Sequence, residues 1–177
     1  EIDAVSSALI IMELSYSDSG LATSAMCNDL ANVIIARHGS AAQQERFLRP
    51  FVERPLLASF CLTEPGAGSD NGAMISCMSK QADGSYRLNG TKCFITNAPI
   101  ADKITLFANT REFGGIRGLT VFMVDRNTPG VTIGKEEDKM GIRASATSEI
   151  ILDDCFVPAT ALVGRNGMGF RIAMETL

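Results

Sequence analysis

The chain has no tryptophan and only one histidine, and the scarcity of histidine excludes one class of site. His38 alone cannot build a metal centre that needs several histidine ligands. The net charge is −4 and no cluster of Lys and Arg occurs, which argues against nucleic acid or an anionic membrane as the main partner. No apolar run approaches the ~20 residues that span a bilayer, and no basic and then apolar leader is present. These absences favour a soluble protein without a metal.

The pattern of the cysteines does not predict a disulfide framework. The five cysteines are odd in number, widely spaced and without a Cys-x-x-Cys pair. Free, buried thiols in a reducing compartment fit this pattern, so we expect a cytoplasmic protein. With 177 residues, of which 46% are hydrophobic and 20% charged, the chain can bury one core of ordinary size.

The first third of the chain is predicted to be helical. Apolar residues recur at helical spacing over residues 2–14, which indicates a core-facing helix, and again over residues 21–37. Gly39 is expected to end the second helix as a residue beyond its C-cap, with His38 placed where an imidazolium favours the helix dipole. A capping box that starts at Ser40 predicts a third helix, which Pro50 ends or kinks.

The remainder is predicted to be mainly β-structure. Short apolar or alternating runs that predict strands cover residues 56–62, 74–82, 86–88, 92–97, 104–108, 119–124, 131–133 and 149–157. Asp83-Gly84 and Asn89-Gly90 favour type I′ hairpins, and Pro129-Gly130 favours a type II turn. The expected fold is α+β: N-terminal helices (1–55), an antiparallel β-barrel or two packed sheets (56–160), and a truncated helix at the end (161–177).

A glycine-rich loop carries most of the chemical information. In Cys61-Leu-Thr-Glu-Pro-Gly-Ala-Gly-Ser-Asp70, a strand of apolar residues enters a turn at Pro65. Gly66 and Gly68 have no Cβ, so a ligand can approach the backbone, and successive N–H groups can surround a phosphate or pyrophosphate, with the Ser69 hydroxyl as a further donor. A plain surface turn has the same composition and is the alternative interpretation.

The order of these residues resembles the signature of the acyl-CoA dehydrogenases, flavoenzymes that oxidise acyl thioesters. Asn89-Gly-Thr-Lys-Cys-Phe-Ile-Thr-Asn97 and Lys139-Met-Gly-Ile-Arg-Ala-Ser, which precedes a strand ending in Phe156-Val-Pro, match two further patterns of the family. The resemblance covers the whole chain and the middle of the family's length. It implies FAD as cofactor, acyl-CoA as substrate, an electron-transferring flavoprotein as acceptor and a homo-oligomeric parent. An acyl-CoA oxidase and a non-catalytic domain that binds FAD or CoA are the alternatives.

The resemblance also implies roles for individual residues. Those expected to contact FAD are Phe60, Leu62, Thr63, Gly68, Ser69, Phe94, Ile95 and Thr96. Thr63 looks like the hydroxyl at the pyrimidine side of the flavin and Thr96 like the one near N5, although threonine is also common in strands for packing reasons. Phe94 stands where many members have Trp, and Ser69 is expected between FAD and CoA.

Substrate residues are expected on the second helix. Thr23 and Met26 align with positions that line the family's acyl pocket, although Met is also an ordinary core residue. Met26 stands where the medium-chain enzymes have a polar residue, which hints at an apolar end of the pocket.

No residue of the chain is assigned as the catalytic base. In the family that carboxylate comes from beyond the position of Leu177, so the chain alone is expected not to turn over, and it is also expected to bind FAD weakly or not at all. Glu64 and Glu175 are poor substitutes, because Glu64 precedes a turn proline and Glu175 turns to another helix face. We expect Asp70 to order the loop and residues 135–139 to form a solvated connection.

Overall fold

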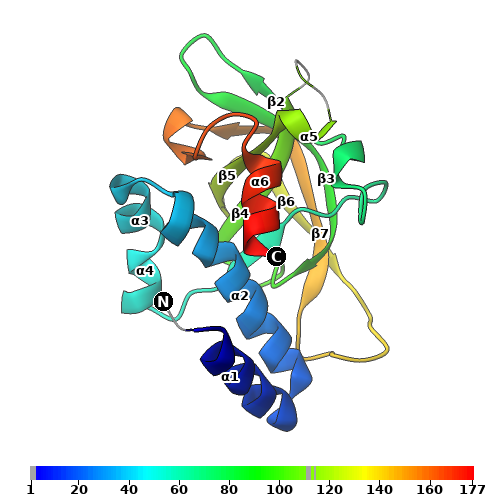
Figure 1. The fold of residues 1–177 in the computed structure, drawn as a ribbon. Coiled ribbons are helices and arrows are strands. Elements are labelled where there is room, and N and C mark those ends of the chain that lie inside the picture. Colours follow the sequence, from blue (N-terminus) through cyan, green and yellow to red (C-terminus); the bar gives the residue numbers. More distant parts are fainter. Residues whose placement is uncertain (1–2, 111–112, 114) are drawn as a thin grey trace.

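The computed structural model describes residues 3–110, 113 and 115–177 (Figure 1). Four helices come first, a large sheet with one short helix between two of its strands follows, and a sixth helix comes last. The helices are α1 (Ala4–Ser17), α2 (Ser19–His38), α3 (Ala41–Phe47), α4 (Arg49–Glu53), α5 (Gly115–Gly118) and α6 (Gly169–Thr176). The prediction of helices, then strands, then a last helix is therefore confirmed.

Eight strands form one sheet. They are β1 (Ala58–Cys61), β2 (Cys77–Lys80), β3 (Tyr86–Thr96), β4 (Lys103–Thr110), β5 (Leu119–Asp125), β6 (Val131–Glu136), β7 (Thr147–Val157) and β8 (Leu162–Val163). Their order is β6-β7-β3-β2-β4-β5-β8, with β1 paired to β4 beside this path. Most pairs are antiparallel, but β4 pairs in parallel with both β1 and β2.

The strands form one open sheet, so the prediction of a closed barrel or of two packed sheets is wrong. Among the described residues β6 and β8 are its two ends and do not pair with each other. Hairpin spacing indicates which strands are neighbours, but closure depends on tilt and stagger, which local turns do not determine. The division at residues 55/56 and 160/161 stays a prediction.

Two apolar clusters lie on opposite faces of the central strands. On β4, Leu106 belongs to a cluster shared by six strands, whereas its neighbour Phe107 packs with the helices. Successive side chains of a strand point to opposite faces, so β4, buried on both, is apolar almost throughout. α2 and α6 cover the helical face, where Ile34 and Ile172 are fully buried (Figure 1).

Helix α1 does not face a core within the described chain, and the prediction that it does is wrong. None of its residues is buried, and Val5, Leu9 and Met12 are 69%, 55% and 66% exposed. The apolar spacing predicts the helix correctly, but it cannot say that this chain supplies a surface to cover it.

The predicted turns have mixed outcomes. Asn89-Gly90 is not a hairpin: both residues lie inside β3, where the pairing with β7 shifts, and Gly90 has φ +147. A Cβ at Gly90 would lie 2.7 Å from the Cα of Ser76, so close backbone contact explains this glycine. The hairpin at Asp83-Gly84 exists, but only Gly84 has positive φ, so its turn is not type I′.

Several boundary predictions are confirmed. The capping box at Ser40 is present, α3 ends before Pro50, which lies in the first turn of α4, and Gly130 has the φ of +89 that a type II turn requires. Gly39 does end α2, but it is the C-cap, with φ −75, and not the predicted residue beyond the cap. Glycine is required there because a Cβ would lie 2.5 Å from the carbonyl oxygen of Ile35.

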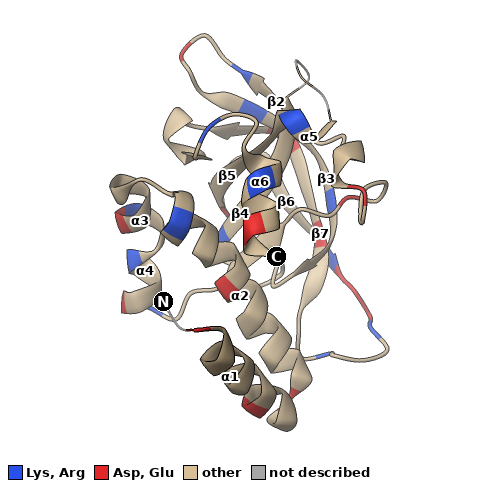
Figure 2. Cartoon of the chain, viewed as in Figure 1, with Lys and Arg blue, Asp and Glu red and all other residues tan. Residues whose placement is uncertain are grey.

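Charged residues of both signs are interspersed over the molecule (Figure 2). The connection from β6 to β7 carries charges of both signs. The sequence analysis assigned Lys135 and Glu136 to this connection, but they belong to β6. Within the described residues no cluster of three or more His, Cys, Asp or Glu could hold a metal ion. In that same part of the chain no helix is long and apolar enough to cross a membrane. All five cysteines are free thiols.

Candidate functional site

The glycine-rich loop, the end of β3 and helix α2 surround one hollow of about 660 Å³. Every residue that the sequence predicts to contact cofactor or substrate lines it: Thr23, Met26, Phe60, Leu62, Thr63, Gly68, Ser69, Phe94, Ile95 and Thr96. The structure thus brings together three regions that are far apart in the sequence. The ligand that each residue contacts stays a prediction.

Strand β3 bulges where it passes the hollow. Its pairing with β7 shifts between Lys92 and Ile95, and Phe94 has φ +55, which is uncommon for a bulky residue. Lys92 and Cys93 are both buried, so the usual alternation breaks, and Phe94 is 69% exposed. Bulges beside active sites commonly re-aim a side chain. Here the bulge presents an aromatic ring to the hollow, where a flat ring system could pack against it.

The polar groups around the hollow are available to a ligand. Within the described part of the chain, no hydrogen bond uses the hydroxyl of Thr63, Ser69 or Thr96. Asn71 also lines the hollow, and its buried Oδ1 has no partner there. Leaving a buried acceptor unpaired costs about 1–3 kcal/mol. These atoms therefore point to a polar ligand or to water.

The glycine-rich loop is open on its outer side. A Cβ at Gly66 or Gly68 would meet no atom within 4 Å, so the protein itself does not occupy the space next to their backbone. Asp70 closes the loop, because its Oδ1 accepts the N–H of Gly72 at 3.0 Å. The prediction that Asp70 orders the loop is confirmed.

Helix α2 is held against the sheet by polar side chains. Asn97 Nδ2 donates to the carbonyl oxygen of Ser24 at 2.9 Å and to that of Ala58 at 3.2 Å. Asn28 Oδ1 accepts the N–H of Ala58 at 2.9 Å. Gly20, Ala22 and Ala31 are also buried on α2, and small residues let a helix approach closely. This seating places Thr23 and Met26 at the hollow.

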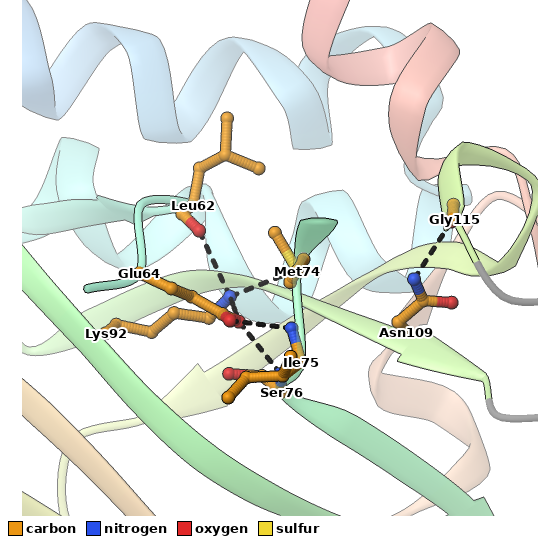
Figure 3. Close-up of polar contacts among 8 residues, drawn as sticks. All are labelled: Leu62, Glu64, Met74, Ile75, Ser76, Lys92, Asn109 and Gly115. Carbon is orange, nitrogen blue, oxygen red and sulfur yellow. Dashed lines mark hydrogen bonds and ion pairs between the residues drawn. The ribbon is translucent and has the colours of Figure 1, made fainter. Parts of the chain in front are cut away.

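A buried ion pair lies beneath the loop, and the sequence analysis did not predict it (Figure 3). Lys92 Nζ lies 2.8 Å from Glu64 Oε1, and the two side chains are 0% and 1% exposed. Lys92 also donates to the carbonyl oxygen of Leu62 at 3.1 Å. Glu64 accepts the N–H groups of Ile75 at 2.7 Å and Ser76 at 3.0 Å.

The surroundings shift the pKa of both partners. Burial alone would raise the pKa of Glu64, but the Lys92 ammonium and the bonds from Ser76 and Ile75 outweigh it and lower that pKa. Burial lowers the pKa of Lys92, against the opposing effect of nearby acidic groups. Period-two spacing from Leu88 places Lys92 inward, and a buried lysine needs an acidic partner, so the sequence held a signal for this pair.

Four further residues line the hollow that the sequence analysis did not select: Cys27, Leu30, Asn71 and Leu177. Thr23, Met26, Cys27 and Leu30 follow the i, i+3, i+4, i+7 spacing of one helix face, which could have identified the two on α2. Cys27 Sγ also lies 3.6 Å from the carbonyl oxygen of Thr96, as a hydrogen-bond donor. Its contact ties α2 to the end of β3.

No carboxylate among the described residues lines the hollow. Glu175 lies on α6, where its side chain contacts Arg171 Nε at 2.6 Å and His38 Nε2 at 3.3 Å. His38 is the last residue of α2, as predicted, and this contact links it to α6. Glu64 and Glu175 thus both form ion pairs away from the hollow, and that neither acts as the base stays a prediction.

Comparison with known proteins identifies the family. The acyl-CoA dehydrogenase middle domain matches residues 59–155, and the N-terminal domain of the same enzymes matches residues 1–54. The chain belongs to the acyl-CoA dehydrogenase family. The short-chain specific acyl-CoA dehydrogenase of Megasphaera elsdenii is 45% identical to it over 177 residues, which are 99% of this chain and 46% of the relative.

Solved structures of the family have the same fold. Butyryl-CoA dehydrogenase from Megasphaera elsdenii superposes with a TM-score of 0.90 at 44% identity, over 94% of this chain and 44% of that one. PigA in complex with FAD superposes with a TM-score of 0.93 at 34% identity, over 99% and 46%. The chain therefore spans less than half the length of these relatives.

Proposed function

We propose that the hollow holds FAD together with the thioester of a short acyl-CoA, and that this chain forms the part of an acyl-CoA dehydrogenase in which the two meet. The whole protein would then dehydrogenate the acyl group at its α,β positions and pass electrons to an electron-transferring flavoprotein. One observation carries the proposal: ten residues selected by motif line a single hollow with unpartnered polar atoms.

The residues present fit FAD. When bound, FAD supplies the redox chemistry by accepting a hydride, which no side chain of the protein can do. The hydroxyls of Thr63 and Thr96 are proposed to hydrogen-bond its ring system, and Phe94 to pack against it. The open backbone at Gly68 leaves room for the phosphates, and Ser69 is proposed to lie between FAD and CoA.

A short acyl chain is the proposed substrate. Met26, Leu30 and Leu177 give the helical side of the hollow an apolar lining, and Met26 is 50% exposed there. The relative from Megasphaera elsdenii is specific for short chains. The base is proposed to be a carboxylate outside this chain. A homo-oligomer and a cytoplasmic location are also proposed, the latter because every cysteine is a free thiol.

Binding of FAD is tested by titrating the chain and following flavin fluorescence. Low affinity is expected, because the chain spans under half of its relatives, and each tenfold loss of affinity is only about 1.4 kcal/mol. Thr63→Val and Thr96→Val, which keep the shape and remove the hydroxyl, should together weaken binding at least tenfold. Thr132→Val, on strand β6, should have no effect. Equal affinity in all variants would refute the proposed site.

The reaction is tested in a chimera in which this chain replaces the matching part of the Megasphaera elsdenii dehydrogenase, which supplies the rest of the fold. Butyryl-CoA should reduce an electron-transferring flavoprotein without consuming oxygen. Peroxide formation would instead indicate an acyl-CoA oxidase. A chimera that holds FAD but reduces no acceptor would favour a binding domain without chemistry.

A further inference from the structure

The two segments that carry the free hydroxyls are not joined directly by the sheet. Among the described residues β1, which leads to Thr63, pairs with β4, whereas β3, which carries Thr96, pairs with β2 and β7. The distance between the two hydroxyls therefore depends on other contacts across the floor of the hollow.

Among the described residues four hydrogen bonds join the segments, and one of them runs from Asn97 Nδ2, in the residue after Thr96, to the carbonyl oxygen of Ala58 on β1 at 3.2 Å. The N–H of Cys93 donates to the carbonyl oxygen of Thr63 at 3.0 Å. The other two come from Lys92 Nζ, which donates to the carbonyl oxygen of Leu62 at 3.1 Å and to Glu64 Oε1 at 2.8 Å. Lys92 thus contacts the residue before Thr63 and the residue after it (Figure 3).

Glu64 extends this connection to the glycine-rich loop. Its backbone forms two hydrogen bonds with Ala67, at 3.0 Å and 3.1 Å, at the base of the turn that leads to Gly68 and Ser69. Its carboxylate accepts two backbone N–H groups from the segment that follows the loop, at 2.7 Å and 3.0 Å. One residue therefore contacts both sides of the loop, the near side through its backbone and the far side through its carboxylate.

We propose that Lys92 and Glu64 are a positioning pair, which sets Thr63 and the glycine-rich loop at a fixed separation from Phe94 and Thr96. The inference rests on the proposed function, in which these groups hold FAD. Stability alone does not account for the pair, because apolar residues in place of a buried ion pair are often equally or more stable. Apolar packing is not directional, whereas the hydrogen bonds from Lys92 to Leu62 and Glu64 fix the position of one segment relative to the other.

The test separates positioning from stability. The double variant Lys92→Met with Glu64→Gln removes both charges, so no unpaired charge is left buried. Its urea midpoint is compared with its ability to bind FAD, and the methyl signals of ¹³C-labelled Thr63 and Thr96 report the local geometry without FAD. The matched control is Lys103→Met with Asp125→Asn, an ion pair between β4 and β5 that does not line the hollow.

In the folded double variant, the Thr63 methyl signal should move and FAD affinity should fall about tenfold or more, which is about 1.4 kcal/mol of binding free energy. The control pair should leave both unchanged. Unaltered Thr63 signals and unaltered FAD affinity in the folded double variant would overturn the proposal.

Glu64→Asp decides the case in which the double variant fails to fold. It keeps the charge and withdraws the carboxylate by one methylene, so a positioning role predicts a moved Thr63 signal in a folded protein, and a purely electrostatic role predicts none. A chimera that binds no FAD at all would refute the proposed function, whereas the threonine signals of the chain would still support or overturn the positioning pair.

Discussion

Replacing Asn97 would test how α2 is seated at the hollow. Asn97 is fully buried with φ +65, and its Nδ2 joins Ser24 on α2 to Ala58 on β1. Asn97→Gly removes both hydrogen bonds, each worth about 1 kcal/mol net, so the free energy of unfolding should fall by about 2 kcal/mol.

Asn97→Ala removes the same two bonds and adds a second effect. Glycine adopts the left-handed region without strain, whereas alanine there costs roughly 1 kcal/mol more. The expected loss is therefore about 3 kcal/mol, and the difference between the two variants isolates the backbone contribution.

Urea denaturation followed by circular dichroism measures both losses, provided that the slope of the transition stays constant. Asn127→Ala is the matched control, because Asn127 is exposed and its replacement should change the free energy of unfolding by less than about 0.5 kcal/mol. An Asn97→Gly variant as stable as the unmodified chain, or an alanine variant no worse than glycine, would refute this reasoning.

Three further predictions concern stability. Gly90→Ala should cost about 1–3 kcal/mol in the urea assay, because its Cβ would lie 2.7 Å from the Cα of Ser76, and a neutral result would show that the strands can separate. Because the pKa of Glu64 is lowered on folding, the ionised carboxylate adds to the free energy of unfolding above a pH of about 4.3, and this addition is lost as the pH falls through the folded-state pKa. Glu64→Gln should therefore flatten this part of the curve of urea midpoint against pH. Leu9→Gln, on the exposed face of α1, should change the free energy of unfolding by less than about 0.5 kcal/mol, whereas Ile35→Ala, fully buried, should lower it by about 2–5 kcal/mol, and equal losses would contradict the placement of α1.

Features that depend on local chemistry could be predicted from the sequence. The capping box at Ser40, the break before Pro50 and the turn at Gly130 each follow from what a few neighbouring residues do to the backbone. The strands around Leu106 and Phe122 are predicted equally well, because each is an apolar run buried in the sheet.

Features that depend on distant contacts could not. Asn89-Gly90 has the composition of a hairpin, but Ser76 approaches Gly90 so closely that the glycine is needed inside a strand. Sheet closure and the burial of α1 likewise depend on surfaces that no short window contains. A local preference was overruled by tertiary structure in each case.

The same distinction between local features and distant contacts applies to the candidate site. The family motifs identify the residues at the hollow, including Thr63 and Thr96, because those motifs contain residues that lie close together in the folded protein. The ion pair of Lys92 and Glu64 joins residues from two motifs that are 28 positions apart, and only the folded chain shows which lysine meets which carboxylate.

At the hollow, the backbone and the side chain of Thr63 and Thr96 have different roles. The carbonyl oxygen of Thr63 accepts the N–H of Cys93, and that of Thr96 accepts the thiol of Cys27, so both backbones are committed to the fold. Their hydroxyls have no partner among the described residues, and that leaves them for a ligand. Valine at either position should therefore alter binding without moving the backbone around the hollow, whereas changes at Lys92 should move that backbone but retain both hydroxyl groups. The two sets of variants can thus distinguish the contacts that position the site from the groups that bind the ligand.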